Sequence, residues 1–138
     1  MVTMRDVEAM ALSMPGASKE LRDDDRPAFL VDKKLFCFHR TQRRDAVDPV
    51  TGERLDDVLV FHVADEEMKS MWLTARPSVY FTTDHFNGYN AILLRIPSLA
   101  EVDDAELAEL VTDAWLSRAP KRLARQWLND QGLDDDAR

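Results

Sequence analysis

The fold is decided by the stretch AFLVDKKLFCFH, residues 28–39. Two short apolar runs, 28–31 and 35–39, lie on either side of the polar triplet Asp32-Lys33-Lys34. Runs of apolar and aromatic residues bounded by a polar turn are typical of paired β-strands. The sequence therefore predicts a hairpin, and a third strand follows from the apolar run Val58 to Val63.

Side chains alternate between the two faces of a strand, so the same residues predict the two faces of the sheet. We expect the aromatic face to pack against helices and the other face to stay partly exposed. The aromatic face would hold Phe36, Phe38, Leu59, Phe61 and Val63, and the other face Leu35, Cys37, His39, Val58, Val60 and His62.

The remaining pattern predicts four helices and two more strands. Helices are expected over 3–14, from 65 to 76, from Asp103, which caps its helix with Glu106 reaching back, and from Pro120. Strands are expected over 79–82 and 91–96, and loops over 17–27 and the long polar arm 40–57. This order favours an α+β fold, a twisted antiparallel sheet with its helices on one face, in one domain over 1–128 with a frayed acidic tail over 129–138.

Composition restricts the possible functions. The 138 residues carry 18 basic and 26 acidic side chains, a net charge of −8, which is opposite to that of a dedicated nucleic-acid binder. The single cysteine, Cys37, excludes an internal disulfide and a cysteine zinc framework. The first residues do not resemble a signal peptide, and no window has the roughly 20 apolar residues of a membrane span, so a cytoplasmic protein is expected.

Four segments resemble the MmcQ/YjbR family. They are Met14-Pro15-Gly16, KKLFCF at 33–38, VYFTTDHFNGYNAILLRI at 79–96 and DAWLSRAPKRLARQW at 113–127. The resemblance covers nearly the whole chain and implies a fold similar to CyaY and frataxin, without agreed catalytic residues. It also implies the family label "DNA-binding", which comes from the shape of the fold, and a fold alone does not establish function.

The segment 84–89 permits a catalytic and a structural interpretation. In the first, His85 is a general base oriented by Asp84 and assisted by Tyr89. In the second, which we favour, Asn87 and Gly88 allow a tight turn that leads into the next strand. We therefore expect no catalytic residue and no enzymatic activity.

A weaker alternative is a ligand or metal site. Cys37, His39 and His62 would share a sheet face, but the fourth ligand of a zinc site is missing, and the acidic residues that a frataxin-like iron site would need are scattered. We expect no metal and no cofactor. An exposed sheet face could instead contact a small ligand or a protein, with His39, His62, His85 and Tyr89 as its weakly indicated residues.

The leading hypothesis is a non-enzymatic binding protein whose partner is double-stranded DNA, with a protein partner as the alternative. Its supports are two basic groups that could neutralise phosphates. The first group would share one helix face, and the second lies at the root of the 40–57 arm. The groups are Arg118, Lys121, Arg122 and Arg125, and Arg40, Arg43 and Arg44.

Overall fold

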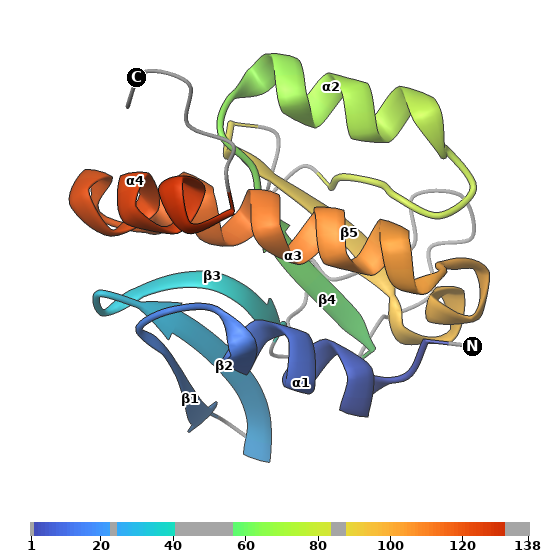
Figure 1. The fold of residues 1–138 in the computed structure, drawn as a ribbon. Coiled ribbons are helices and arrows are strands. Elements are labelled where there is room, and N and C mark those ends of the chain that lie inside the picture. The colour runs from blue at the N-terminus through green and yellow to red at the C-terminus, as the bar shows by residue number, and fades with distance from the viewer. Residues whose placement is uncertain (1, 23–24, 41–56, 84–87, 132–138) are drawn as a thin grey trace.

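The computed structural model describes residues 2–22, 25–40, 57–83 and 88–131 (Figure 1). Its elements follow the order α1, β1, β2, β3, β4, α2, β5, η3, α3, α4. Their bounds are α1 Met4–Ser13, β1 Ala17–Arg22, β2 Arg26–Val31, β3 Lys34–His39, β4 Val58–His62, α2 Glu66–Ala75, β5 Ala91–Arg95, the 3₁₀ helix η3 Ile96–Glu101, α3 Asp104–Arg118 and α4 Lys121–Asp130.

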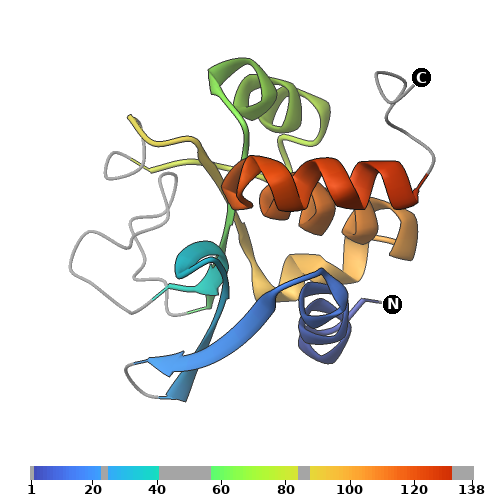
Figure 2. The same cartoon turned by 60° about the vertical axis from the view of Figure 1, so that its left-hand side comes forward.

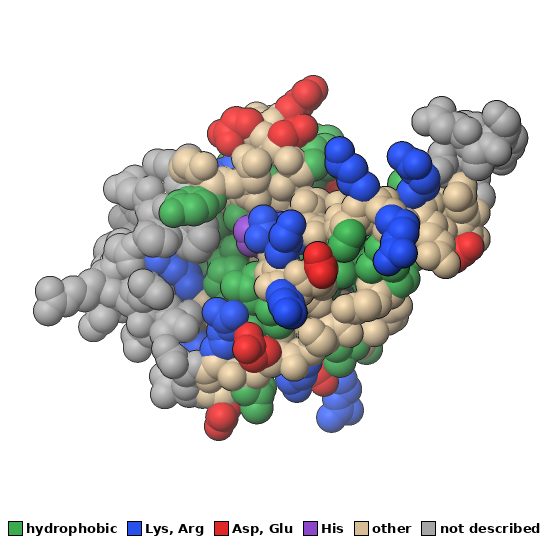
Figure 3. All heavy atoms as spheres, turned by 90° about the vertical axis from the view of Figure 1, so that its left-hand side faces the viewer, with side chains coloured by type: hydrophobic (Ala, Val, Ile, Leu, Met, Phe, Trp, Pro, Cys, Tyr) green, Lys and Arg blue, Asp and Glu red, His purple; other side chains and the backbone are tan. Residues whose placement is uncertain are grey.

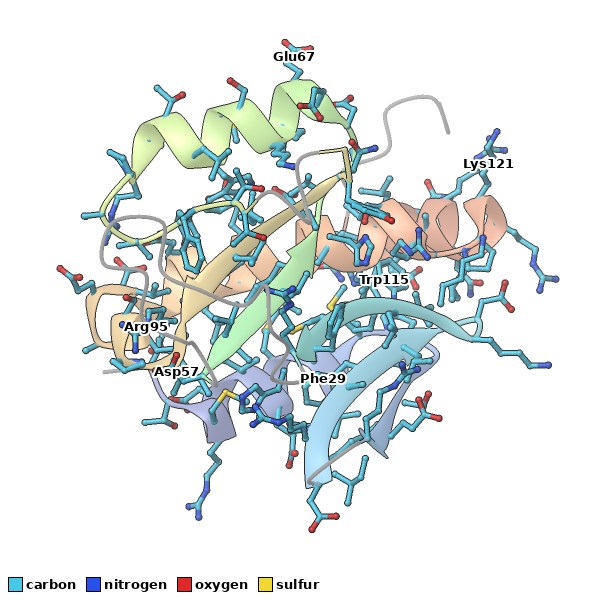
Figure 4. All side chains as sticks on the ribbon, turned by 180° about the vertical axis from the view of Figure 1, so that it is seen from behind. Phe29, Asp57, Glu67, Arg95, Trp115 and Lys121 are labelled. Atoms are coloured by element: carbon cyan, nitrogen blue, oxygen red, sulfur yellow. The ribbon has the colours of Figure 1, made fainter. Side chains whose placement is uncertain are left out.

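The five strands form one antiparallel sheet in sequence order, β1-β2-β3-β4-β5. Helices α1 and α3 cover one face of this sheet, and α2 lies above β5 (Figures 1 and 2). At one end of the sheet, Arg95 Nε and Nη2 donate to the two carboxylate oxygens of Asp57 at 3.1 and 3.0 Å, and the two side chains point toward one another (Figure 4). The predicted α+β fold is confirmed.

Side-chain caps start the helices where the sequence places them. Thr3 and Asp6 form a reciprocal capping box on α1, and Asp103 Oδ1 accepts from the backbone N–H of Glu106 at the start of α3. The Glu106 carboxylate does not reach back to its own cap, however. It binds Arg76 and Tyr80 instead, so this expectation was wrong.

The predicted sheet faces are partly wrong because of a β-bulge. Leu35 pairs with Leu30 and Cys37 pairs with Phe29, so Phe36 is the extra residue on β3. A bulge shifts the alternation by one residue. Phe36 and Cys37 are consequently both buried in the helix-covered core, whereas Phe38 packs on the opposite face with Val58 and Val60.

Two other expectations differ from the structure. Residues 17–22, expected as a loop, form the edge strand β1, most of whose side chains are exposed. Residues 79–82, expected as a strand, contribute one bridge between Phe81 and Leu93. Of the 40–57 arm, residues 41–56 lie outside the described residues, as do 132–138 of the expected tail, while α4 includes residues 129 and 130.

The main core fills the space between the sheet and the helices. Its largest fully buried side chains, each no more than 1% exposed, are Phe29, Phe36, Phe61, Tyr80 and Trp115. In the described part of the chain, no helix is long and apolar enough to cross a membrane.

Candidate functional site

The basic residues near the C-terminus lie on two helices rather than one. Helix α3 ends at Arg118, and Pro120, which has no backbone N–H to extend the ladder, precedes α4 as its N-cap. Lys121 and Arg122 are therefore the first two residues of α4, and Arg125 lies one turn further along. The expectation that one helix face carries all four is wrong.

Aromatic and backbone contacts hold α4 against the domain. The rings of Trp115 in α3 and Trp127 in α4 lie 5.9 Å apart, and Trp115 Nε1 donates to the carbonyl oxygen of Pro15 at 3.0 Å. Gly16, at φ +71°, lies close to Leu123 of α4, since a Cβ built there would be 3.3 Å from Leu123 Cδ2. This contact fixes the start of α4 beside the turn that follows α1.

The β2–β3 turn lies next to the start of α4. The same Cβ position at Gly16 is 3.9 Å from Val31, the last residue of β2, so Leu123 and Val31 converge on one point. Arg118 Nε donates to the carbonyl oxygen of Leu35 in β3 at 3.1 Å. In Figure 1, the tip of the β2–β3 hairpin lies at the left of the molecule, on the same side as α4.

Lysines of the β2–β3 turn lie on the same side of the molecule as α4. Asp32 and Lys33 adopt positive φ values of 51° and 66°, a tight turn that leaves Lys33 and Lys34 exposed. We call the exposed cations of these two elements the basic face, namely Lys33, Lys34, Lys121, Arg122 and Arg125.

Figure 3 looks onto this side of the molecule. Lysine and arginine side chains spread over its middle, with apolar side chains between them, while acidic side chains gather at its upper rim and also lie singly among the basic ones and near the lower edge. Lys121, the first residue of α4, projects outward from the N-terminal end of this helix (Figure 4). The overall charge of −8 therefore does not describe the local charge here.

The helix dipole favours anions at this position. Cations near a helix C-terminus compensate its partial negative charge, which accounts for Arg118 at the end of α3. Lys121 and Arg122 instead lie at the positive end of α4, where no acidic residue occupies the first turn. The partial positive charge of the helix start repels the two cations, and a bound anion would relieve this repulsion. Their position therefore favours anion binding over the stability of α4.

The second predicted basic group does not join this face. Arg40 is only 4% exposed, and its backbone carbonyl accepts from Arg26 Nη1 at 3.2 Å. Arg40 therefore does not belong to the basic face, because its side chain is buried in the domain. Arg43 and Arg44 lie outside the described residues.

The residues proposed for a metal or ligand site are separated by the bulge. Cys37 lies on the helix-covered face and pairs with Phe61, whereas His62 pairs with Ala91 on the opposite face. His39 Nε2 lies 2.7 Å from Arg26 Nη1. In the described parts of the chain, no group of three or more His, Cys, Asp or Glu side chains could hold a metal ion.

The second sheet face is not an exposed contact surface. Val58 and Val60 are 1% and 0% exposed, and Ala91 and Leu93 beside them are equally buried. The expectation that this face is exposed is therefore wrong. His62 is partly buried, and burial, with a smaller contribution from Arg118, lowers its pKa to about 4, so that its ring is neutral at pH 7.

The segment around the expected 84–89 turn is described only from Gly88. Tyr89 is 56% exposed, and its backbone carbonyl accepts from Lys69 Nζ at 2.7 Å. His85 lies outside the described residues. Lys69, which the sequence did not single out, is only 3% exposed, and its position in an amphipathic helix gave no sign of this burial.

The geometry defines an α+β domain with a helix-covered antiparallel sheet and one locally basic side. The YjbR family model matches residues 12–117, and the chain belongs to this family. Two mycobacterial proteins described as uncharacterized, Rv2570 of Mycobacterium tuberculosis and Mb2600 of Mycobacterium bovis, are 35% identical over 136 residues, 96% of this chain and all of theirs.

A solved structure supports the same fold. The crystal structure of Deinococcus radiodurans protein DR2400, with a DUF419 domain, superposes with a TM-score of 0.62 and 18% identity. The superposition covers 98% of this chain and 91% of that one. At this level of identity, the likeness concerns the fold alone.

Proposed function

We propose that this protein is a non-enzymatic binding protein that contacts the phosphate backbone of duplex DNA through the basic face. The observation that carries the proposal is the position of Lys121 and Arg122 at the positive end of α4, beside Lys33 and Lys34 of the β2–β3 turn. Phosphate groups bind readily at such helix ends, where backbone N–H groups and cations point the same way.

The geometry favours backbone contact over base reading. The basic face has exposed, long and flexible cations on a helix end and a two-residue turn. Lysine and arginine side chains reach phosphate oxygens at any DNA sequence, whereas among the bases they pair mainly with guanine. The proposed binding is therefore insensitive to DNA sequence and sensitive to salt.

The experiment is fluorescence anisotropy with a labelled duplex of about 20 base pairs at about 50 mM salt, where phosphate-driven affinity is near its strongest. The wild-type chain binds, and the combined change Lys121→Ala, Arg122→Ala and Arg125→Ala weakens binding about tenfold or more without changing the circular dichroism spectrum. Absence of duplex binding by the wild-type chain rules the proposal out.

A matched control removes the same charge elsewhere. Arg5, Lys19 and Arg22 lie on α1 and β1, and two of them pair with carboxylates, Lys19 with Glu8 at 2.5 Å and Arg22 with Glu20 at 3.0 Å. Their combined change to Ala keeps wild-type duplex binding. Equal weakening by both triple variants would show that net charge alone determines binding and would contradict the basic face.

A further inference from the structure

A cavity of about 490 Å³ lies between α2 and the segment that follows it. One side of α2 and Thr82 line this cavity. None of the lining residues belongs to α4 or to the β2–β3 turn, which carry the basic face. Its volume is within the range of roughly 300–1,000 Å³ typical of small-molecule sites. The lining residues are Glu66, Lys69, Ser70, Leu73, Thr74 and Thr82.

A buried lysine forms part of this wall. Lysine is almost never fully buried unless it is paired, and Lys69, which is only 3% exposed, donates from Nζ to the Tyr89 carbonyl oxygen at 2.7 Å. Burial lowers the pKa of Lys69, and the nearby carboxylate of Glu66 counteracts this effect. The cavity therefore has a cation and an anion three residues apart on one helix side.

Thr82 adds an unsatisfied hydroxyl. Its Oγ1 is buried and has no hydrogen-bond partner within the described ranges, and the same holds for Thr83 next to it. A buried hydroxyl without a partner costs about 1–3 kcal/mol, so such a group usually pairs with an ordered water or a bound ligand.

We propose that this cavity binds a small amino-carboxylate, a molecule with one carboxylate and one ammonium group such as a free amino acid. The carboxylate accepts hydrogen bonds from Lys69 and Thr82, the ammonium group pairs with Glu66, and an apolar side chain contacts Leu73. A simple anion would be repelled by Glu66 and a simple cation by Lys69, so a ligand with both charges fits the wall best. This site is independent of the basic face.

The test uses L-leucine, with acetate and methylammonium as single-charge probes. Each is titrated into the 138-residue chain at up to about 10 mM, and binding is followed by thermal shift and by backbone amide NMR shifts of residues 66–74. L-Leucine raises the melting temperature and moves these amides, whereas acetate and methylammonium have smaller effects. No response to L-leucine, or an equal response to acetate, overturns the proposal.

Two variants and a control connect the response to the residues. Lys69→Met keeps the apolar stem, removes the charge and weakens L-leucine binding about tenfold or more. Thr82→Val removes the hydroxyl without changing any charge, and it weakens L-leucine binding severalfold. Lys19→Met, which changes an exposed lysine on β1 outside the basic face, leaves L-leucine binding unchanged.

If Lys69→Met does not fold, the L-leucine affinity of Thr82→Val, measured by the same amide shifts, decides the test. Unchanged L-leucine affinity in a folded Thr82→Val protein overturns the proposal. Duplex binding is measured on both folded variants and stays at the wild-type value, so that failure of this site and failure of the basic face are distinguishable.

Discussion

The hydroxyl of Tyr80 donates a 2.5 Å hydrogen bond to Glu106 Oε2, joining the segment after α2 to the first turn of α3. Arg76 Nη1 binds the other carboxylate oxygen at 2.7 Å, and Arg76 Nη2 donates to the Glu101 carbonyl oxygen. Burial and this hydrogen bond raise the pKa of Tyr80, so that its hydroxyl stays protonated and donates at all ordinary pH values. The ring of Trp72 packs edge-on against Tyr80 at 5.2 Å.

Tyr80→Phe removes one hydrogen bond to a charged acceptor and keeps the ring in place. We expect the free energy of unfolding to fall by about 1.5–3 kcal/mol, measured by urea denaturation. Tyr89→Phe is the control, because the Tyr89 side chain is 56% exposed, and it changes stability by less than about 0.5 kcal/mol. Equal stability of the Tyr80→Phe and wild-type proteins would show that the hydrogen bond contributes nothing.

Gly16→Ala is expected to destabilise the protein and disturb α4. The φ of +71° is strained for an L-residue, and the new Cβ would lie 3.3 Å from Leu123 Cδ2. A loss of about 1–3 kcal/mol is expected from thermal or urea unfolding. Gly88→Ala is the matched control, since nothing lies within 4 Å of its added Cβ. A larger loss in Gly88→Ala than in Gly16→Ala would contradict the described contact of Leu123 with the turn.

The β-bulge predicts an unreactive thiol. Cys37 is 0% exposed on the helix-covered face, and burial raises its pKa, so the nucleophilic thiolate is scarce. We expect labelling by a disulfide reagent at pH 8 to occur only as fast as the chain opens, and to become immediate in denaturant. Rapid labelling of the folded protein would place Cys37 on an accessible face and show that Phe36 is not bulged.

His62 makes stability fall in mild acid. The folded pKa is about 4 and the ordinary value 6.5, so between these values the unfolded chain binds a proton that the folded chain does not. The contribution is complete above pH 6.5 and is lost as the pH falls toward 4. In His62→Gln, the decrease in unfolding free energy from pH 7 to pH 4.5 is smaller than in the wild type by roughly 1–3 kcal/mol. Identical pH profiles of the two proteins would contradict the buried, neutral ring.

Local chemistry made part of this fold predictable. Thr3 with Asp6, and Asp103, start helices through side-chain caps that can be read from the sequence, and Pro120 separates α3 from α4. The helix-covered position of Phe36 and Phe61 also follows from their apolar character.

Features that depend on distant contacts were missed. The bulge at Phe36 arises from the register in which β2 pairs with β3, and residues 35–39 alone do not determine this register. Residues 17–22 form a strand with mostly exposed side chains, so they lack the apolar alternation by which strands are recognised. Burial of Arg40 and Lys69 likewise depends on what packs around them, whereas Lys121, Arg122 and Arg125 are exposed, as is usual for charged side chains.

The most direct test of the basic face is the salt dependence of duplex binding, measured by anisotropy between about 50 and 200 mM salt. Each neutralised phosphate contributes about −0.9 to the slope of log K against log salt concentration, so contact by most of the five cations gives about −3 to −4.5. Loss of Lys121, Arg122 and Arg125 makes the slope about 2 to 3 less negative. A wild-type slope near zero, or the same slope in the triple variant, would contradict phosphate contact through this face.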